Sequence, residues 1–360
     1  MGNLFAHIKS YFSPFPKVKS LDGLQGLEKV DALFHNLVAE KKVPGLAVTF
    51  LDKDETVLQK GYGFSNLDKK IFVDPKQTVF RIASISKCIT GLALGKMVED
   101  RIINLDESIY TCVPYYPKKR FGFTLRQLAS HTAGIRGYRG KEYALNQDFS
   151  IKDGINMFKN DPLVFKPGTG YLYNSFDFVL LSLAMQEASG VPFERYVEEH
   201  ILKPLGLHGT FSPNYGAGLK KMENHAHFYT KRSMCFKQSV EVNNQYKLAG
   251  GGYLSTSKDV ARLGRAILKR ELLSDATYDQ LLTSELINGK PTYYGLGFQV
   301  SQDAKDRYFV GHIGSSVGAY TNLYIYPEQE KVISILINCT DPKVQPVLDE
   351  AIDCFLKDNV

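Results

Sequence analysis

The chain has 360 residues but lacks a hydrophobic run long enough to span a membrane, which needs about 18 or more consecutive apolar residues. Its best runs, at 178–185 and 332–339, are only about eight residues long and contain Ser or Asn. A strong charge bias is also lacking, because 44 basic and 38 acidic residues leave a net charge of +6. These absences argue against a membrane-spanning protein and against nucleic acid as the main partner.

The cysteines are too few and too scattered for a disulfide framework. There are five, an odd number, and none lies in a C-x-x-C pair that would hold zinc. Residues 1–13 carry an amphipathic stripe, but not the continuous apolar stretch of a secretory signal. We therefore expect a cytoplasmic, reducing location, with the stripe docked on its own domain. Peripheral membrane contact through the stripe is the alternative.

No pattern in the chain predicts a metal or a cofactor. His225 and His227 would share one face of a strand, but neither an H-E-x-x-H motif nor an evident third ligand accompanies them. The glycines at 250–252 lack the preceding strand and the spacing of a dinucleotide site. We expect a small-molecule or peptide substrate, with no nucleic acid, cofactor or metal.

The hydrophobic periodicity predicts the fold class. Helical spacing occurs at 24–41, 84–100 and 344–356, and helix patterns with Pro-Gly punctuation fill the middle, about 105–247. Alternating stretches typical of strands lie toward the two chain ends, at 45–51, 55–63, 79–82, 296–300, 307–311, 319–325 and 332–337. We predict an α/β (α+β) fold in which both chain ends build an antiparallel sheet flanked by helices, with an inserted helical lobe. A segment at 1–20 would precede a single domain at 21–360.

Two serines stand in the pattern Ser-x-x-Lys, in which a lysine one helical turn on can reach the serine hydroxyl. One pair is Ser84 and Lys87, at a predicted strand-to-helix junction where backbone N–H groups and the helix dipole favour a developing negative charge. The other is Ser255 and Lys258, which reads better as a helix start capped by Thr256. Ser84 is therefore the candidate nucleophile.

A rival serine pattern, G-x-S-x-G, occurs at 314–318. The nucleophile elbow of α/β-hydrolases needs a helix directly after its serine, whereas 319–326 alternates like a strand. No histidine follows His312 to complete the chain order of that triad. We expect a hairpin there instead.

Several blocks in chain order resemble the serine β-lactamase-related family, which includes class C β-lactamases, low-molecular-weight penicillin-binding proteins, D-aminopeptidases and esterases. They are R-I-A-S-I-S-K at 81–87, L-A-S-H-T-A-G at 128–134, F-K-P-G at 165–168 leading to Y-L-Y-N-S at 171–175, G-G-G-Y-L-S-T at 250–256, and H-I-G at 312–314. The blocks at 81–87 and 242–256 most resemble the branch formed by the mitochondrial serine β-lactamase-like protease and its bacterial relatives.

The resemblance implies catalytic roles for three residues. Ser84 would attack a carbonyl to give an acyl-enzyme, and Lys87 would help remove its proton. Tyr173, on the helical lobe, would pass the proton to the leaving group. His131 lies in a block that we interpret as scaffold.

The resemblance also implies a substrate-binding strand. His312 would orient the substrate, and its ordinary pKa of about 6.5 predicts a change of charge near neutral pH. Gly314 would leave room for the substrate backbone, and the N–H groups of Ser84 and Ser315 would hold the oxyanion. Ser175 stands where the family's Tyr-x-Asn motif has Asn, which puts the handling of a β-lactam or an amide side chain in doubt.

These features together predict a serine hydrolase that acts through an acyl-enzyme on a peptide, amide or ester. A peptidase or esterase is favoured over a true β-lactamase, because no motif guarantees the water that fast deacylation needs. The alternative is a scaffold or interaction protein that keeps the fold without efficient turnover.

Overall fold

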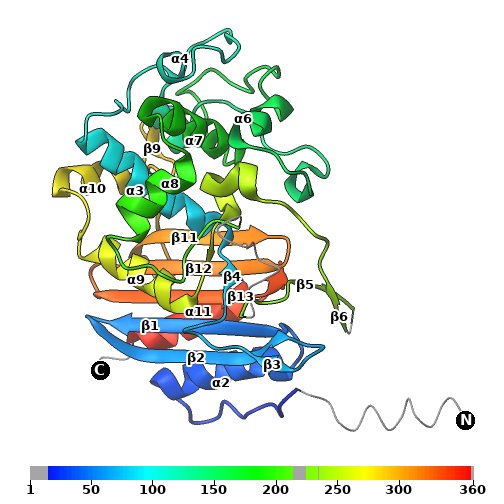
Figure 1. The fold of residues 1–360 in the computed structure, drawn as a ribbon. Coiled ribbons are helices and arrows are strands. Elements are labelled where there is room, and N and C mark those ends of the chain that lie inside the picture. Colours follow the sequence, from blue (N-terminus) through cyan, green and yellow to red (C-terminus); the bar gives the residue numbers. More distant parts are fainter. Residues whose placement is uncertain (1–14, 214–223, 234, 358–360) are drawn as a thin grey trace, which may run out of the picture.

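The centre of the molecule is a seven-stranded antiparallel sheet with the order β10-β11-β12-β13-β1-β2-β3 (Figure 1). This computed structural model describes residues 15–213, 224–233 and 235–357, so the predicted stripe at 1–13 lies outside the described residues. The sheet strands are β1 (Gly45–Asp52), β2 (Glu55–Asn66), β3 (Ile71–Phe72), β10 (Gln299–Gln302), β11 (Tyr308–Ser316), β12 (Ala319–Tyr326) and β13 (Lys331–Ile337). Early β1 pairs with late β13, so both ends of the chain build one sheet.

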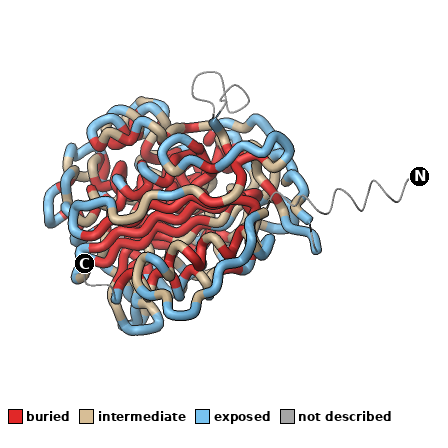
Figure 2. Tube along the Cα trace, turned by 90° about the horizontal axis from the view of Figure 1, so that it is seen from below, coloured by how far each residue is buried: buried red, intermediate tan, exposed pale blue. Residues whose placement is uncertain are grey.

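Helices cover both faces of this sheet, which explains why its central strands are apolar on both sides. On one face, α2 (Gly26–Ala39) packs against α11 (Gln345–Lys357), and on the other α9 (Ser257–Leu268) packs on β1, β12 and β13. Successive residues of β1 point to opposite faces of the sheet. Ala47 belongs to the hydrophobic core on one face, and Val48 belongs to the core on the other. Figure 2 shows the strands buried along the sheet, with exposed loops around them.

The middle of the chain forms a helical region above the sheet in Figure 1. Its helices are α3 (Ser86–Glu99), α4 (Ile109–Cys112), α5 (Leu125–Ala129), α6 (Ile151–Gly154), α7 (Phe176–Ser189) and α8 (Phe193–Val197), and α10 (Asp275–Leu281) contacts α3 from the later part of the chain. Every residue from Phe176 to Met185 is buried, as expected for a helix without a polar face. α7 is thus the central helix of this region.

Short elements connect the helical region to the sheet. The short helical turns are η1 (Ala83–Ile85), η2 (Glu142–Ala144), η3 (Ile155–Met157), η4 (Glu198–Leu202), η6 (Gln245–Lys247) and η7 (Leu248–Gly252). The short strands are β4 (Phe80–Arg81), β5 (Tyr229–Arg232), β6 (Cys235–Gln238), β7 (Leu254–Ser255), β8 (Leu286–Ile287), β9 (Lys290–Pro291) and β14 (Cys339–Thr340).

The predicted fold class is confirmed, with two local differences. The strand expected at 79–82 does not join the main sheet, because β4 pairs with β7 instead. The strand expected at 307–311 is longer than predicted and runs on to Ser316. It is followed by the antiparallel strand β12, so the G-x-S-x-G pattern lies in a hairpin and does not precede a helix. The division at residue 20 and the limits of the helical lobe stay predictions.

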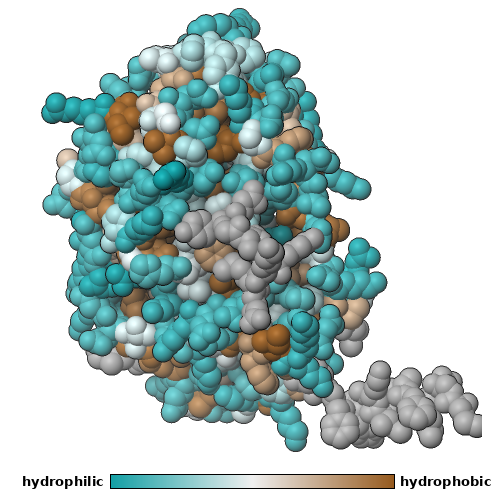
Figure 3. All heavy atoms as spheres, in the orientation of Figure 1, coloured by the Kyte–Doolittle hydropathy of each residue, from teal (hydrophilic) through white to brown (hydrophobic). Residues whose placement is uncertain are grey.

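Within the described residues, no helix is both long and apolar enough to cross a bilayer. The surface seen in Figure 3 is mostly hydrophilic, with hydrophobic residues in small separate patches.

Candidate active site

Ser84 lies in a sharp turn between β4 and α3. The preceding residue, Ala83, has φ +47°, a left-handed conformation that costs a non-glycine residue about 1–2 kcal/mol. The turn places Ser84 at the start of the helical segment, where the first N–H groups have no intrahelical partner. Thr321 of β12 fixes the turn by donating a hydrogen bond of 2.9 Å from its hydroxyl to the carbonyl of Ile82.

Gly314 lets strand β11 approach this turn closely. A Cβ on Gly314 would lie 2.3 Å from the Thr321 hydroxyl oxygen and 2.9 Å from both the Ala83 Cβ and the Ile82 carbonyl oxygen. The glycine is therefore required for the contact between β11 and the serine turn. Its expected role beside the substrate backbone stays a prediction.

Lys87 is fully buried one helical turn after Ser84, and its Nζ lies 3.2 Å from the Ser84 Oγ. The same ammonium group donates a hydrogen bond to the carbonyl of Gly250 in η7. Burial, and to a smaller extent the positive charge of Lys247, lower the pKa of Lys87 from 10.5 to about 7. Lys87 is thus a lysine that can carry a neutral amine near physiological pH.

Tyr173 approaches the serine from the loop before α7. Its hydroxyl donates a hydrogen bond of 2.8 Å to the Ser84 Oγ, and its ring centroid lies 4.9 Å from the Lys87 Nζ. The residue as a whole is 39% exposed, although protein packs around its hydroxyl. Burial raises the pKa of Tyr173, so the phenol keeps its proton at neutral pH. The structure thus brings together the three residues predicted as catalytic.

The buried pair His131 and Asp177 packs next to Tyr173, through the His131 ring. The His131 ring lies 4.6 Å from the Tyr173 ring, and its Nδ1 is 2.9 Å from the Asp177 Oδ2. Both side chains have no exposed surface. His131 therefore packs as scaffold, as expected, but directly against the tyrosine.

Asn174 holds the same loop in place. Its amide nitrogen donates to the backbone carbonyls of Ile135 and Leu172. It also donates to the Asp177 Oδ2 at 2.6 Å, while its own oxygen accepts from the Asp177 N–H. Because Asn174 is occupied in this way, Ser175 and not Asn174 is the polar side chain at the cavity.

His312 does not lie where the sequence predicted. It is only 1% exposed, and its contacts assign the tautomer: Nδ1 donates to the Ile313 carbonyl, and Nε2 accepts from the Tyr294 hydroxyl at 3.0 Å. Burial lowers the pKa of His312 to about 3. The expected change of charge near neutral pH is therefore wrong. The ring lies behind Tyr173, at 5.7 Å between centroids, and not on the wall of the cavity at Ser84.

Ser84 opens into a cavity of about 80 Å³. Ser175 and Ser315 lie on its wall, and their role in substrate binding stays a prediction. Tyr138 and Lys247 also line it, and neither was predicted. Lys247 lies within a block that resembles the family, but nothing in the local pattern distinguishes it from a surface lysine.

The second Ser-x-x-Lys pattern is a helix start, as predicted. The Thr256 hydroxyl caps α9 by accepting from the Asp259 N–H at 3.1 Å, and the Ser255 Oγ bonds to the Thr210 hydroxyl. The Asp259 carboxylate accepts a hydrogen bond from the Gly209 N–H.

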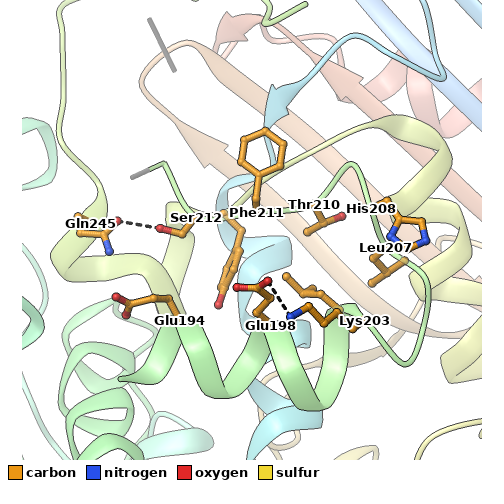
Figure 4. A pocket seen from close by; sticks show the side chains of 11 residues that line it. Glu194, Glu198, Lys203, Leu207, His208, Thr210, Phe211, Ser212 and Gln245 are labelled. Atoms are coloured by element: carbon orange, nitrogen blue, oxygen red, sulfur yellow. Dashed lines mark hydrogen bonds and ion pairs between the residues drawn. The ribbon is translucent and has the colours of Figure 1, made fainter. Parts of the chain in front are cut away.

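A separate pocket of about 390 Å³ contains none of the predicted site residues (Figure 4). Glu198 and Lys203 form an ion pair at its edge, and Ser212 donates a hydrogen bond to Gln245. The described part of the chain also contains no group of three or more His, Cys, Asp or Glu residues that could hold a metal ion.

Comparison with known proteins identifies the family. A sequence profile of the Beta-lactamase family matches residues 30–357. The mitochondrial serine beta-lactamase-like protein LACTB of Homo sapiens is 25% identical over 402 aligned residues, covering 85% of this chain and 73% of that protein. The octameric penicillin-binding protein homologue from Pyrococcus abyssi superposes with a TM-score of 0.79 at 24% identity, over 92% of this chain and 78% of that one. The D-amino acid amidase from Ochrobactrum anthropi SV3 gives 0.79 at 18% identity, over 90% and 97%. The resemblance predicted from the motif blocks is confirmed, and the chain belongs to the Beta-lactamase family of penicillin-binding-protein-like serine hydrolases.

Proposed function

We propose that this protein hydrolyses an ester, amide or peptide through an acyl-enzyme formed on Ser84. One observation carries the proposal: the Ser84 Oγ lies within hydrogen-bond reach of both the Lys87 Nζ, at 3.2 Å, and the Tyr173 hydroxyl, at 2.8 Å. A nucleophile needs a nearby base, and a lysine with a pKa of about 7 is such a base at neutral pH.

Acylation follows from these contacts. The neutral amine of Lys87 takes the proton of the Ser84 hydroxyl while the oxygen attacks the carbonyl carbon of the substrate. The N–H groups of Ser84 and Ser315 donate to the resulting oxyanion. Tyr173 gives its proton to the leaving group and regains one from Lys87, so the amine is again neutral when the acyl-enzyme has formed.

Deacylation reverses these roles. A water molecule attacks the ester carbonyl and loses its proton through Tyr173 and Lys87. The Ser84 oxygen then leaves and recovers a proton, which releases the acid. A peptidase, amidase or esterase fits this proposal better than a β-lactamase, and the D-amino acid amidase among the structural relatives supports an amide or peptide substrate.

Covalent labelling tests the proposal. A fluorophosphonate probe should tag the wild-type protein, and mass spectrometry should find the tag on Ser84. Ser84→Ala should abolish the tag, whereas Ser255→Ala, the matched control from the second Ser-x-x-Lys pattern, should keep it. A wild-type protein that is folded but neither labelled nor active on D-amino acid amides, 4-nitrophenyl esters and a cephalosporin would favour the scaffold alternative.

We also propose a cytoplasmic or other reducing location. All five cysteines are unpaired in the structure, which supports this. Cell fractionation with compartment markers tests it, and recovery in a secreted fraction would contradict it.

A further inference from the structure

Lys247 is a buried cation beside the nucleophile. It comes from η6, lines the cavity of Ser84 and is only 6% exposed. Its Nζ donates a hydrogen bond of 2.6 Å to the backbone carbonyl of Tyr143 and lies 5.5 Å from the ring centroid of Tyr138. Within the described ranges, no carboxylate forms an ion pair with Lys247.

A second buried cation lies close to the first. Arg81 is 7% exposed, donates to the carbonyl of Val317 at 2.7 Å and packs its guanidinium 3.9 Å from the centroid of the Phe228 ring. Burial lowers the pKa of Lys247, and the charge of Arg81 is a second, smaller cause of the same shift. Arg81 likewise pairs with no carboxylate in the part of the chain that the structure describes.

Two buried positive charges without an anion are costly, because burial removes their hydration and the carbonyl dipoles replace only part of it. Arg81 itself lines a different pocket, but its guanidinium donates to the carbonyl of Val317, a residue of the cavity wall, and its charge is felt at Lys247. An anionic group in that cavity would be stabilised by the positive charges of both Lys247 and Arg81. A carboxylate matches this best, since it accepts short charge-assisted hydrogen bonds from an ammonium group.

The position of Tyr173 indicates which part of the substrate enters the cavity. Tyr173 reaches Ser84 from the loop before α7, whereas Lys247 reaches the cavity from η6. In the proposed mechanism the leaving group departs on the side of Tyr173. The part that reaches Lys247 is therefore the part that stays bound to Ser84.

We propose that Lys247 is a specificity-determining residue that binds a carboxylate on the acyl part of the substrate. This inference rests on the proposed function, because it concerns the substrate of the same serine.

The test uses pairs of 4-nitrophenyl esters whose acyl chains end in either a carboxylate or the neutral carboxamide, over a short series of chain lengths. Wild-type kcat/KM should favour the carboxylate by at least about tenfold at one of these lengths. Lys247→Met should remove the preference, so that the ratio of kcat/KM for the carboxylate to kcat/KM for the carboxamide falls to about one. Lys247→Arg keeps the charge and should keep a preference.

Lys258→Met is the matched control, since it removes a charge of the same type from an exposed position on α9. It should leave the preference unchanged. Thermal melting confirms that each variant is folded. If Lys247→Met does not fold, the carboxylate preference is compared between wild type and Lys247→Arg.

Equal turnover of both esters by the wild type, or a preference that persists in folded Lys247→Met, would overturn the inference and leave the proposed function intact. Failure of the proposed function looks different, because then neither ester is hydrolysed and the neutral fluorophosphonate does not label Ser84.

Discussion

The rate of acylation of Ser84 should rise with pH and level off near pH 8, because only the neutral amine of Lys87 accepts the serine proton. Burial lowers the pKa of this lysine from 10.5 to about 7. At pH 7, about half of the molecules then carry a neutral Lys87, against about 0.03% for a lysine with its ordinary pKa. Burial therefore increases the competent fraction of the enzyme about 1,600-fold.

The same arithmetic gives the shape of the profile. Between pH 6 and pH 8 the neutral fraction rises from about 9% to about 91%, so the rate constant should increase about tenfold and then reach a plateau. The assay is the second-order rate constant of fluorophosphonate labelling at each pH, with the decay of the probe measured in parallel.

Lys87→Arg is the control for this profile. It keeps the positive charge, but a guanidinium does not lose its proton in proteins, so labelling should be slow at every pH. A wild-type rate that does not change between pH 6 and pH 8, or that keeps climbing tenfold per unit above pH 9, would refute the assignment of Lys87 as the base.

Three substitutions test the remaining geometry. Tyr173→Phe removes the hydroxyl that bonds to Ser84 and should lower kcat at least about 100-fold without changing Tm; near-normal turnover would exclude the proton shuttle. Gly314→Ala places a Cβ 2.3 Å from the Thr321 hydroxyl oxygen, so denaturant unfolding should show a loss of about 1–3 kcal/mol, with slower labelling of the serine. Asn174→Ala removes the amide that bonds to Ile135, Leu172 and Asp177 and should cost about 2–4 kcal/mol by the same measurement; unchanged stability would show that other contacts hold the loop.

Features set by neighbours in the chain were predictable from the sequence. The apolar stripe of α2 and the alternation of β12 follow from local periodicity, and the observed bounds differ from the prediction by a residue or two. Ser84 and Lys87 were predictable as a pair for the same reason, since one helical turn brings them together whatever the rest of the fold does. Tyr173 came only from the resemblance of its block, because its contact with Ser84 spans 89 positions.

Features set by packing between distant segments were not predictable. His312 was expected to contact substrate, but Tyr294 and Tyr173 enclose it, and both come from other parts of the chain. The close approach of Thr321 and Ala83 to Gly314 was not predictable either, because these residues meet it only in the folded protein. Both features concern an environment and not a residue type.

The two lysines at the cavity show why environment matters more than identity here. Lys87, without exposed surface, has a pKa of about 7, and Lys247, slightly less enclosed, has a pKa of about 8. What distinguishes them is position, because the Nζ of Lys87 lies 3.2 Å from the Ser84 Oγ, whereas the Nζ of Lys247 donates to the Tyr143 carbonyl. The first is placed to act as a base on Ser84, and the second is proposed to act as a cation toward the substrate. The charge of Lys247 is also one of the causes that lower the pKa of Lys87. The residue proposed to select the substrate thus helps to keep the base uncharged, which links the choice of substrate to the activation of Ser84.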